Sequence, residues 1–145
     1  MDCTFCGIIA GKKPAHLVAR TQSVVVFLDH SPLQPGHCLV VPADHYLEMS
    51  DCPGDVLGLL VEAAKSVALA QRAALGAQGN FVAVNNLVSQ GIPHLHFHIV
   101  PRWRQDGLKG FFWPRQKYQS DSEAASIAES LRGELVRTLA HGDFA

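Results

Sequence analysis

The sequence lacks any apolar run of the roughly 18 residues that a membrane-spanning helix requires. It also lacks the basic start and apolar stretch of a secretory signal, because Met1 is followed at once by Asp2 and Cys3. An excess of charge of one sign is missing too, since the formal net charge is −1 at pH 7. These absences argue against a membrane partner and against a surface that attracts polyanions as a whole, so any phosphate must be bound locally. We expect a cytoplasmic protein.

Repeats, low-complexity tracts and linker-like segments are also missing from the 145 residues. With 48% hydrophobic and 17% charged residues, the composition is typical of a globular protein. We therefore expect a single domain over residues 1–145, in which residues 103–145 form a C-terminal extension. The four cysteines are expected to be reduced, because disulfides are rare in cytosolic proteins. Histidine is the unusual residue: there are eight, and three of them fall within five positions.

Four short runs rich in β-branched or aromatic residues predict strands. They span residues 24–28, 38–41, 81–85 and 94–100. The turn-forming residues 34–36 separate the first two runs. The last run alternates strictly between histidine and apolar residues, and a proline follows it.

Two further segments carry apolar residues at helical spacing. In residues 56–75 they recur every three or four positions, with Asp51 and Pro53 suited to the start of a helix and Gly76 to its end. In residues 122–139 they recur every four positions, which predicts an amphipathic helix. Antiparallel strands with two flanking helices define an α+β fold.

The run from residue 94 to residue 100 is predicted to place three histidines on one face of a strand. Strand side chains alternate between faces at about 3.3 Å per residue, so His94, His96 and His98 should be neighbours about 6.6 Å apart. The intervening apolar residues should point into the core: Leu95, Phe97 and Ile99. Two or three imidazoles could bind a metal ion, or one could act as a nucleophile while its neighbours contact a phosphate. One histidine on a structural metal and two in catalysis would also fit, and the spacing alone does not decide.

The pattern H-φ-H-φ-H-φ-φ in this run resembles the signature of the histidine triad nucleotide-binding family. Three further segments are similar to elements of that family: Cys3–Gly11, Phe27–Pro32 and Gly36–Pro42. The resemblance runs in register from about Cys3 to Arg102. It implies the histidine-triad fold, an antiparallel sheet with one long central helix and a C-terminal helix.

The resemblance implies roles for three histidines. His96 matches the residue that attacks the α-phosphorus and forms a nucleotidyl-histidine intermediate, which water then hydrolyses. An ordinary imidazole has a pKa near 6.5, so it is mostly neutral and nucleophilic at pH 7. In the family, a backbone carbonyl near the first triad histidine fixes the tautomer of this residue. His98 matches a histidine on the phosphate oxygens, and His37 matches one that supports the triad from the same pocket.

The resemblance also implies nucleotide contacts outside the triad. Asp29 matches a carboxylate on the ribose hydroxyls, although a turn-forming role alone is the alternative. Gln90 matches a glutamine that holds the phosphate. Asn85 matches an asparagine on the phosphate side, with Asn86 as the neighbouring alternative. The remaining histidines are given no role: His16, His30 and His141.

A zinc site is implied near the N-terminus. By itself, a C-x-x-C pair is weak evidence, because structural zinc sites take four ligands. A branch of the family has two N-terminal cysteines, a histidine after a strand and the first triad histidine as zinc ligands. The matching residues are Cys3, Cys6, His45 and His94. Such a closed site would pin an N-terminal helix to the triad segment.

Two segments depart from the family pattern. The loop before the triad is short, and Gly91 stands where some relatives have a serine or threonine that helps to protonate the leaving group. Basic and aromatic residues alternate in residues 102–115, which could suggest nucleic-acid stacking. We favour packing against the body or a partner subunit, and we expect Phe111–Trp113 to help shape the leaving-group pocket. Nucleic acid is not expected as a partner.

The leading hypothesis is therefore a histidine triad hydrolase or nucleotidyltransferase acting at the α-phosphate of an adenosine-based nucleotide, in a homodimer. The substrate could be a dinucleoside polyphosphate, a phosphoramidate or an aminoacyl adenylate. One alternative is a nucleotide-binding adaptor with vestigial catalysis. Another is a zinc hydrolase that uses the triad itself as ligands.

Overall fold

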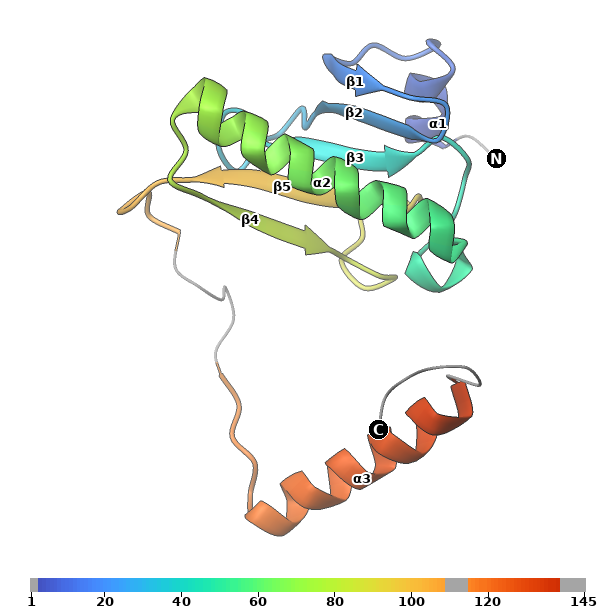
Figure 1. The fold of residues 1–145 in the computed structure, drawn as a ribbon, viewed down its shortest axis with the longest axis vertical. Coiled ribbons are helices and arrows are strands. Elements are labelled where there is room, and N and C mark those ends of the chain that lie inside the picture. Colours follow the sequence, from blue (N-terminus) through green and yellow to red (C-terminus); the bar gives the residue numbers. More distant parts are fainter. Residues whose placement is uncertain (1–2, 109–114, 139–145) are drawn as a thin grey trace. The chain divides into compact units, whose positions relative to one another are not determined.

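The computed structural model describes residues 3–108 and 115–138. Contacts divide the chain into two compact units, Met1–Gly107 and Leu108–Ala145. The first unit contains an antiparallel sheet, a short helix and a long helix, and the second contains one helix (Figure 1). In the described part of the chain, no helix is long and apolar enough to cross a membrane.

A five-stranded antiparallel sheet forms the centre of the first unit, in the order β1-β2-β3-β5-β4. The strands are β1 (Leu17–Arg20), β2 (Val24–Leu28), β3 (Cys38–Pro42), β4 (Gly79–Val84) and β5 (Phe97–Arg102). The predicted α+β fold is confirmed. The residues of β1 are all exposed, so this strand has none of the apolar alternation by which a strand is recognised in a sequence.

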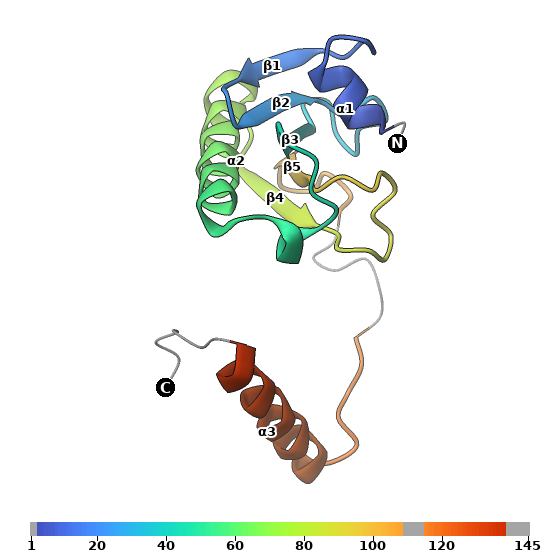
Figure 2. The same ribbon diagram turned by 90° about the vertical axis from the view of Figure 1, so that its right-hand side faces the viewer.

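The two faces of the sheet are covered by different helices. Because strand side chains alternate, Val24 and Val26 of β2 join the core beneath α2 (Gly54–Leu75), and Val25 and Phe27 join the core beside α1 (Thr4–Ile9). Figure 2 shows β2 between these two helices. The sheet is therefore the middle of three layers.

The long helix α2 ends where the sequence predicts, because Gly76 adopts the left-handed conformation with φ 66°. Its start differs from the prediction. Asp51 belongs to a separate 3-10 helix, Met49–Asp51, and Pro53 precedes α2 without any side-chain cap. A proline disfavours helical backbone in the residue before it, and Cys52 is indeed extended (φ −86°, ψ 129°), so the helix cannot begin as early as Asp51.

The prediction of a strand over residues 94–100 is wrong at both ends. His94, Leu95 and His96 precede β5 as irregular backbone, because β3 pairs with β5 only as far as Val40 opposite Phe97. The N–H of Leu95 donates instead to the carbonyl of Tyr46, 2.7 Å away. At the other end, β5 passes through its proline because the backbone still pairs with β4 as far as Arg102.

The apolar side of the triad segment nevertheless packs as predicted. The side chains of Leu95, Phe97 and Ile99 are buried in the core beneath α2. The histidines between them therefore face the other side of the sheet.

In the second unit, α3 spans Asp121–Thr138. The predicted amphipathic helix over residues 122–139 is confirmed up to Thr138, and residue 139 lies outside the described residues. Its apolar stripe is exposed: Ile127, Leu131 and Leu135.

Candidate functional site

The middle histidine of the triad is held in one tautomer by the backbone of the first. The Nδ1 atom of His96 lies 2.7 Å from the carbonyl oxygen of His94. Because a carbonyl only accepts hydrogen bonds, Nδ1 carries the proton and Nε2 keeps its lone pair. Burial lowers the pKa of His96, although the bond to His94 and the charge of Asp29 raise it. A neutral imidazole with a free electron pair at Nε2 results.

The third triad histidine is oriented by a short relay of hydrogen bonds. The N–H of Leu33 donates to Nδ1 of His37 over 3.2 Å, so His37 carries its own proton on Nε2. That atom lies 3.0 Å from Nδ1 of His98. His37 therefore donates to His98, and the proton of the neutral His98 ring is placed on Nε2.

Burial keeps this pair of rings neutral. It lowers the pKa of His98 to about 4, helped by the neighbouring His96 and His37 and opposed by Asp29. Burial also lowers the pKa of His37. The rings of His96 and His98 lie 4.8 Å apart between centroids. At neutral pH, an electron pair on one ring and an N–H donor on the other therefore lie side by side.

These two histidines line a cavity of about 750 Å³. Its walls come from α1, β2, β3 and β5, from the segments that follow α1 and β2, and from the loop between β4 and β5. The apolar lining residues include Phe5, Ile8, Phe27, Leu39 and Ile92, and the polar ones include Asp29, Asn85, Ser89 and Gln90. No lysine or arginine is among the lining residues that belong to the described chain. The cavity is large enough for a nucleotide, and a large part of its wall is apolar.

Asp29 forms a turn and also lines the cavity. Its Oδ1 accepts the N–H of Ser31 at 2.9 Å, as in a turn, and its Oδ2 lies 3.8 Å from Nε2 of His37. The carboxylate also lines the cavity. A turn-forming role therefore does not remove it from the site.

The two neighbouring asparagines are used differently. Asn85 lines the cavity, and its amide donates to the carbonyl of Ser89 at 3.2 Å. The side chain of Asn86 instead accepts the N–H of Met49 at 3.2 Å, which ties the loop to the segment before α2. Of the two, Asn85 is the one in position to contact a ligand.

Gln90 lines the cavity but also holds the loop that contains it. Its side-chain oxygen accepts the N–H of Leu87 at 3.1 Å, and its amide donates to the carbonyl of Leu47 at 2.5 Å. The side chain is buried. One of its two amide hydrogens remains for a phosphate, so the expected ligand contact is compatible with this bracing role.

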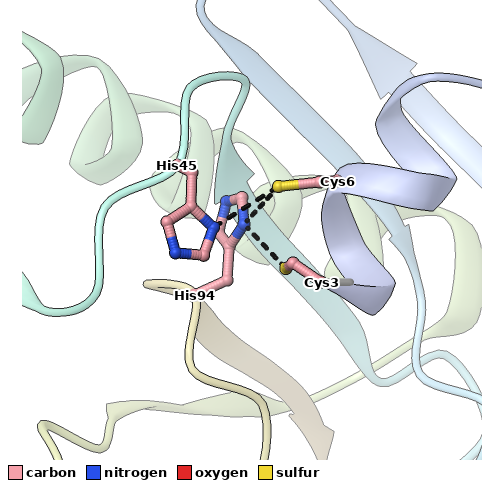
Figure 3. Close-up of side chains that lie close together, drawn as sticks. All are labelled: Cys3, Cys6, His45 and His94. Carbon is pink, nitrogen blue, oxygen red and sulfur yellow. Dashed lines mark hydrogen bonds between the residues drawn. The ribbon is translucent and has the colours of Figure 1, made fainter. Parts of the chain in front are cut away.

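A second group of side chains converges beside α1. The donor atoms of Cys3, Cys6, His45 and His94 all lie within 4.8 Å of one another. The Sγ of Cys3 lies 3.5 Å from Nδ1 of His94, and the Sγ of Cys6 lies 3.4 Å from Nδ1 of His45 (Figure 3). The structure thus brings together all four residues that the sequence suggested as metal ligands.

The chemistry of this group fits a metal ion. The Nε2 of His94 lies 3.0 Å from the carbonyl of Pro42, so its proton is on Nε2 and the lone pair of Nδ1 points to the sulfurs. Two thiols and two imidazoles form a closed set for a tetrahedral ion such as zinc. Only one triad histidine belongs to this group, which separates the metal centre from His96 and His98.

A further cluster, formed by Asp29, His37 and His98, has a similar spread of donor atoms within 4.8 Å. It fits a metal less well. A neutral histidine that binds a metal through Nε2 must carry its proton on Nδ1, but Nδ1 of His37 already accepts the N–H of Leu33. The relay and metal binding would therefore require opposite tautomers of His37.

Some functional features carry no signal in the sequence. The carbonyl of Pro42 and the N–H of Leu33 are such features, because they belong to the backbone. The carbonyl of His94, by contrast, lies where the family resemblance implied a carbonyl that fixes the tautomer of His96. His16 and His30 also line the cavity, although the sequence gave no reason to place them there. His141 and Phe111–Trp113 lie outside the described residues.

Comparison with known proteins agrees with this arrangement. The HIT domain family matches residues 10–105. A HIT-like protein of Saccharolobus solfataricus, named as uncharacterised, is 41% identical over 140 residues, which cover 94% of this chain and 97% of that protein. An adenosine 5'-monophosphoramidase of Schizosaccharomyces pombe is 29% identical over 137 residues, covering 93% of this chain and 99% of that protein.

Solved structures show the same fold. The crystal structure of a Zn-bound histidine triad family protein from Mycobacterium smegmatis superimposes with a TM-score of 0.72 and 29% identity, covering 92% of this chain and 98% of that one. The histidine-triad fold expected from the sequence is therefore confirmed. This chain belongs to the HIT domain family.

Proposed function

We propose that this protein hydrolyses adenosine 5'-phosphate derivatives by nucleophilic attack of His96 on the α-phosphorus. The observation that carries the proposal is the free electron pair of His96 Nε2 in the wall of a nucleotide-sized cavity. Family membership and the adenosine 5'-monophosphoramidase among the relatives support a nucleotide hydrolase. The cavity would hold the base against its apolar wall and the ribose near Asp29.

The reaction would proceed in two displacements. In the first, the Nε2 electron pair forms a bond to phosphorus, and the leaving group departs with the electrons of its own bond and takes up a proton. The bond from Nδ1 to the His94 carbonyl stabilises the positive charge that develops on the imidazole. In the second, the oxygen of water forms a bond to phosphorus and the water releases a proton, while the Nε2–P bond breaks and its electrons return to Nε2, which restores the neutral histidine. The N–H at Nε2 of His98 contacts the phosphate oxygens in both steps.

The charge of the cavity favours a leaving group without negative charge. The described lining residues include no lysine or arginine, and Asp29 contributes a carboxylate. The pKa of His98 is about 4, so this ring adds no positive charge at neutral pH. A polyphosphate leaving group would bring several negative charges without a counter-charge. We therefore propose an amine leaving group, as in an adenosine 5'-phosphoramidate, in preference to a dinucleoside polyphosphate.

We also propose that Cys3, Cys6, His45 and His94 hold a structural zinc ion. The convergence of the four side chains and the tautomer of His94 support this site. Elemental analysis of protein purified without added metal should give about one zinc per chain. A well-folded protein with only traces of metal would contradict it.

A substrate panel with a His96 variant tests the function. Wild-type protein should hydrolyse adenosine 5'-phosphoramidate faster than dinucleoside polyphosphates or nucleotide sugars. His96→Ala should lose turnover by several orders of magnitude and still bind AMP, and a covalent nucleotidyl adduct should be trapped on wild-type protein only. Micromolar AMP binding without turnover of any substrate would instead favour a nucleotide-binding adaptor. Full activity of His96→Ala would refute the proposal.

A further inference from the structure

The short helix α1 belongs to both the metal centre and the nucleotide cavity. The candidate metal group includes Cys3, the residue just before the helix, and Cys6, which lies in the helix. Thr4, Phe5 and Ile8 line the cavity. Six residues of helix therefore contribute to two sites at once.

This helix cannot hold its position by itself. It has six residues and no side-chain hydrogen bond at its N-terminal cap. Isolated helices shorter than about 12 residues are marginal in water, so the placement of α1 depends on contacts with the rest of the protein. One such contact is the guanidinium of Arg20, which donates to the carbonyl of Ile9 at 2.8 Å.

Phe5 provides the contact between the two sites. Its ring meets the ring of His94 at 5.8 Å and that of His96 at 5.2 Å between centroids, in both cases edge to face. It also packs edge to face on Phe27 at 5.3 Å, and only 6% of it is exposed. One buried side chain therefore touches a candidate metal ligand, the proposed nucleophile and the far wall of the cavity.

We propose that Phe5 is a positioning residue that couples the two sites, so that metal bound beside α1 raises the affinity of the cavity for a nucleoside monophosphate. Ligation of Cys3 and Cys6 orders α1 and thereby sets Phe5 in the cavity wall. A nucleotide that then binds no longer has to order this wall, so its binding is more favourable. Thermodynamic linkage requires that the nucleotide raise the affinity for the metal by the same factor.

This inference rests on the proposed function, and titration with two ligands tests it. The affinity for AMP is measured by calorimetry in zinc-loaded and metal-free protein, and the affinity for Zn²⁺ is measured against a chromophoric chelator with and without saturating AMP. We expect both ratios to agree and to fall within the roughly 5- to 150-fold range typical of coupled sites. Amide hydrogen exchange in α1 should slow with either ligand.

Two leucine variants separate coupling from general loss of packing. Phe5→Leu should reduce the coupling factor to about one. Phe27→Leu is the matched control, because Phe27 is also buried and lines the same cavity but belongs to β2 and not to the helix that carries the cysteines. It should weaken AMP binding and leave the coupling factor unchanged.

The remaining outcomes are distinct. Equal AMP affinity with and without zinc in wild-type protein would overturn the coupling and leave the proposed function standing. Absence of AMP binding in any state would overturn both. A third outcome is that removal of the metal unfolds the chain. The effect of the metal on AMP affinity would then come from folding of the whole chain, and it would be the same in the two variants. This outcome would overturn the role of Phe5.

Discussion

At the scale of single residues, backbone groups decide which nitrogen of His96 and of His98 carries a proton. The carbonyl of His94 places the proton of His96 on Nδ1. The N–H of Leu33 acts through His37 to place the proton of His98 on Nε2. His96 therefore has a free electron pair for nucleophilic attack, and His98 has an N–H that can donate a hydrogen bond. These assignments follow from donors and acceptors that cannot exchange roles, because a peptide N–H only donates and a carbonyl only accepts.

The relay predicts the effect of replacing His37. His37→Phe preserves an aromatic ring but removes the N–H that His98 accepts, so His98 would be free to take either tautomer. We expect kcat for adenosine 5'-phosphoramidate to fall about tenfold with little change in KM. This loss should be smaller than the roughly 10²- to 10³-fold expected when His98→Ala removes a whole donor. Steady-state kinetics of both variants provide the measurement, and an unchanged kcat in His37→Phe would contradict the relay.

The buried His98 also predicts how stability depends on pH. Its pKa is about 4 in the folded protein, against 6.5 for an ordinary histidine. Between these values the unfolded chain binds a proton that the folded protein does not, so stability is full above about pH 6.5 and falls as pH drops towards 4. One such group contributes a slope of at most about 1.4 kcal/mol per pH unit. Urea unfolding at a series of pH values gives the measurement.

The matched variant His98→Asn isolates this contribution. It has no titrating group at position 98, whereas His37, whose pKa burial also lowers, is present in both proteins. Loss of the proposed zinc ion in acid would affect both proteins as well and would cancel in the difference. The wild-type curve should fall more steeply than the variant curve between about pH 6.5 and 4. Parallel curves would show that His98 is not kept neutral by the fold.

At the scale of elements, the loop between β4 and β5 is under backbone strain. Leu87 and Ser89 have positive φ angles of 65° and 60°, which residues other than glycine rarely adopt. Leu87 is 59% exposed, so its side chain gains little from packing. The N–H of Leu87 is held by the side chain of Gln90, which closes the loop beside the cavity. The loop therefore keeps Leu87 in a backbone conformation that leucine disfavours.

A glycine at this position should relieve the strain. Leu87→Gly is expected to stabilise the protein by up to about 1 kcal/mol, because the left-handed conformation costs most residues about 1–2 kcal/mol and glycine almost nothing. Val88→Gly is the control, since Val88 is 81% exposed and does not have a positive φ. It should be neutral or destabilising. Chemical denaturation distinguishes the two, and a destabilised Leu87→Gly would contradict the strain.

Elements with a buried, periodic pattern could be predicted from the sequence. The bounds of β2 and the end of α2 follow from apolar runs and from Gly76, and both agree with the structure. β1 could not be found, because all its residues are exposed. The triad run alternates like a strand for its whole length, yet backbone pairing begins only at Phe97. A sequence pattern reports which side chains are buried, and it does not report where the backbone finds its partners.

The candidate site could likewise be predicted from the sequence only in part. Its side chains could be proposed because their types and spacing match a family pattern, and the structure brings the four expected metal ligands together. The family resemblance also implied the backbone carbonyl that fixes the tautomer of His96, and the structure has the carbonyl of His94 there. The N–H of Leu33 and the carbonyl of Pro42 could not be proposed, because they are backbone groups brought close by the fold. Phe5 was equally hidden, since a single aromatic residue in an apolar segment has the same pattern as any core residue.

At the scale of the whole molecule, neither the chain as a whole nor the described lining of the cavity has an excess of positive charge. The net charge is −1, and the described cavity lining contains no lysine or arginine. A protein of this kind has no strong electrostatic field to draw in anions. Recognition of the proposed nucleotide substrate would then depend on the apolar part of the lining, on directed hydrogen bonds and, in the predicted homodimer, on groups of the second copy. The predicted homodimer would have twice the 15.7 kDa of one chain in sedimentation experiments.

The aromatic stretch Phe111–Trp113 is where a contribution from the extension is predicted. It lies outside the described residues, and the expectation comes from its composition and from the family resemblance. Replacing all three residues by alanine in the full chain should change the ranking of leaving groups while AMP binding stays within about twofold, because the residues proposed to contact the base and the ribose lie in the first unit. Rates with adenosine phosphoramidates that carry small and bulky amines provide the ranking, and sedimentation provides the oligomeric state. If neither the ranking nor the oligomeric state changes, these aromatic residues neither shape the leaving-group pocket nor join the subunits, and specificity must then be set by residues 1–107 alone.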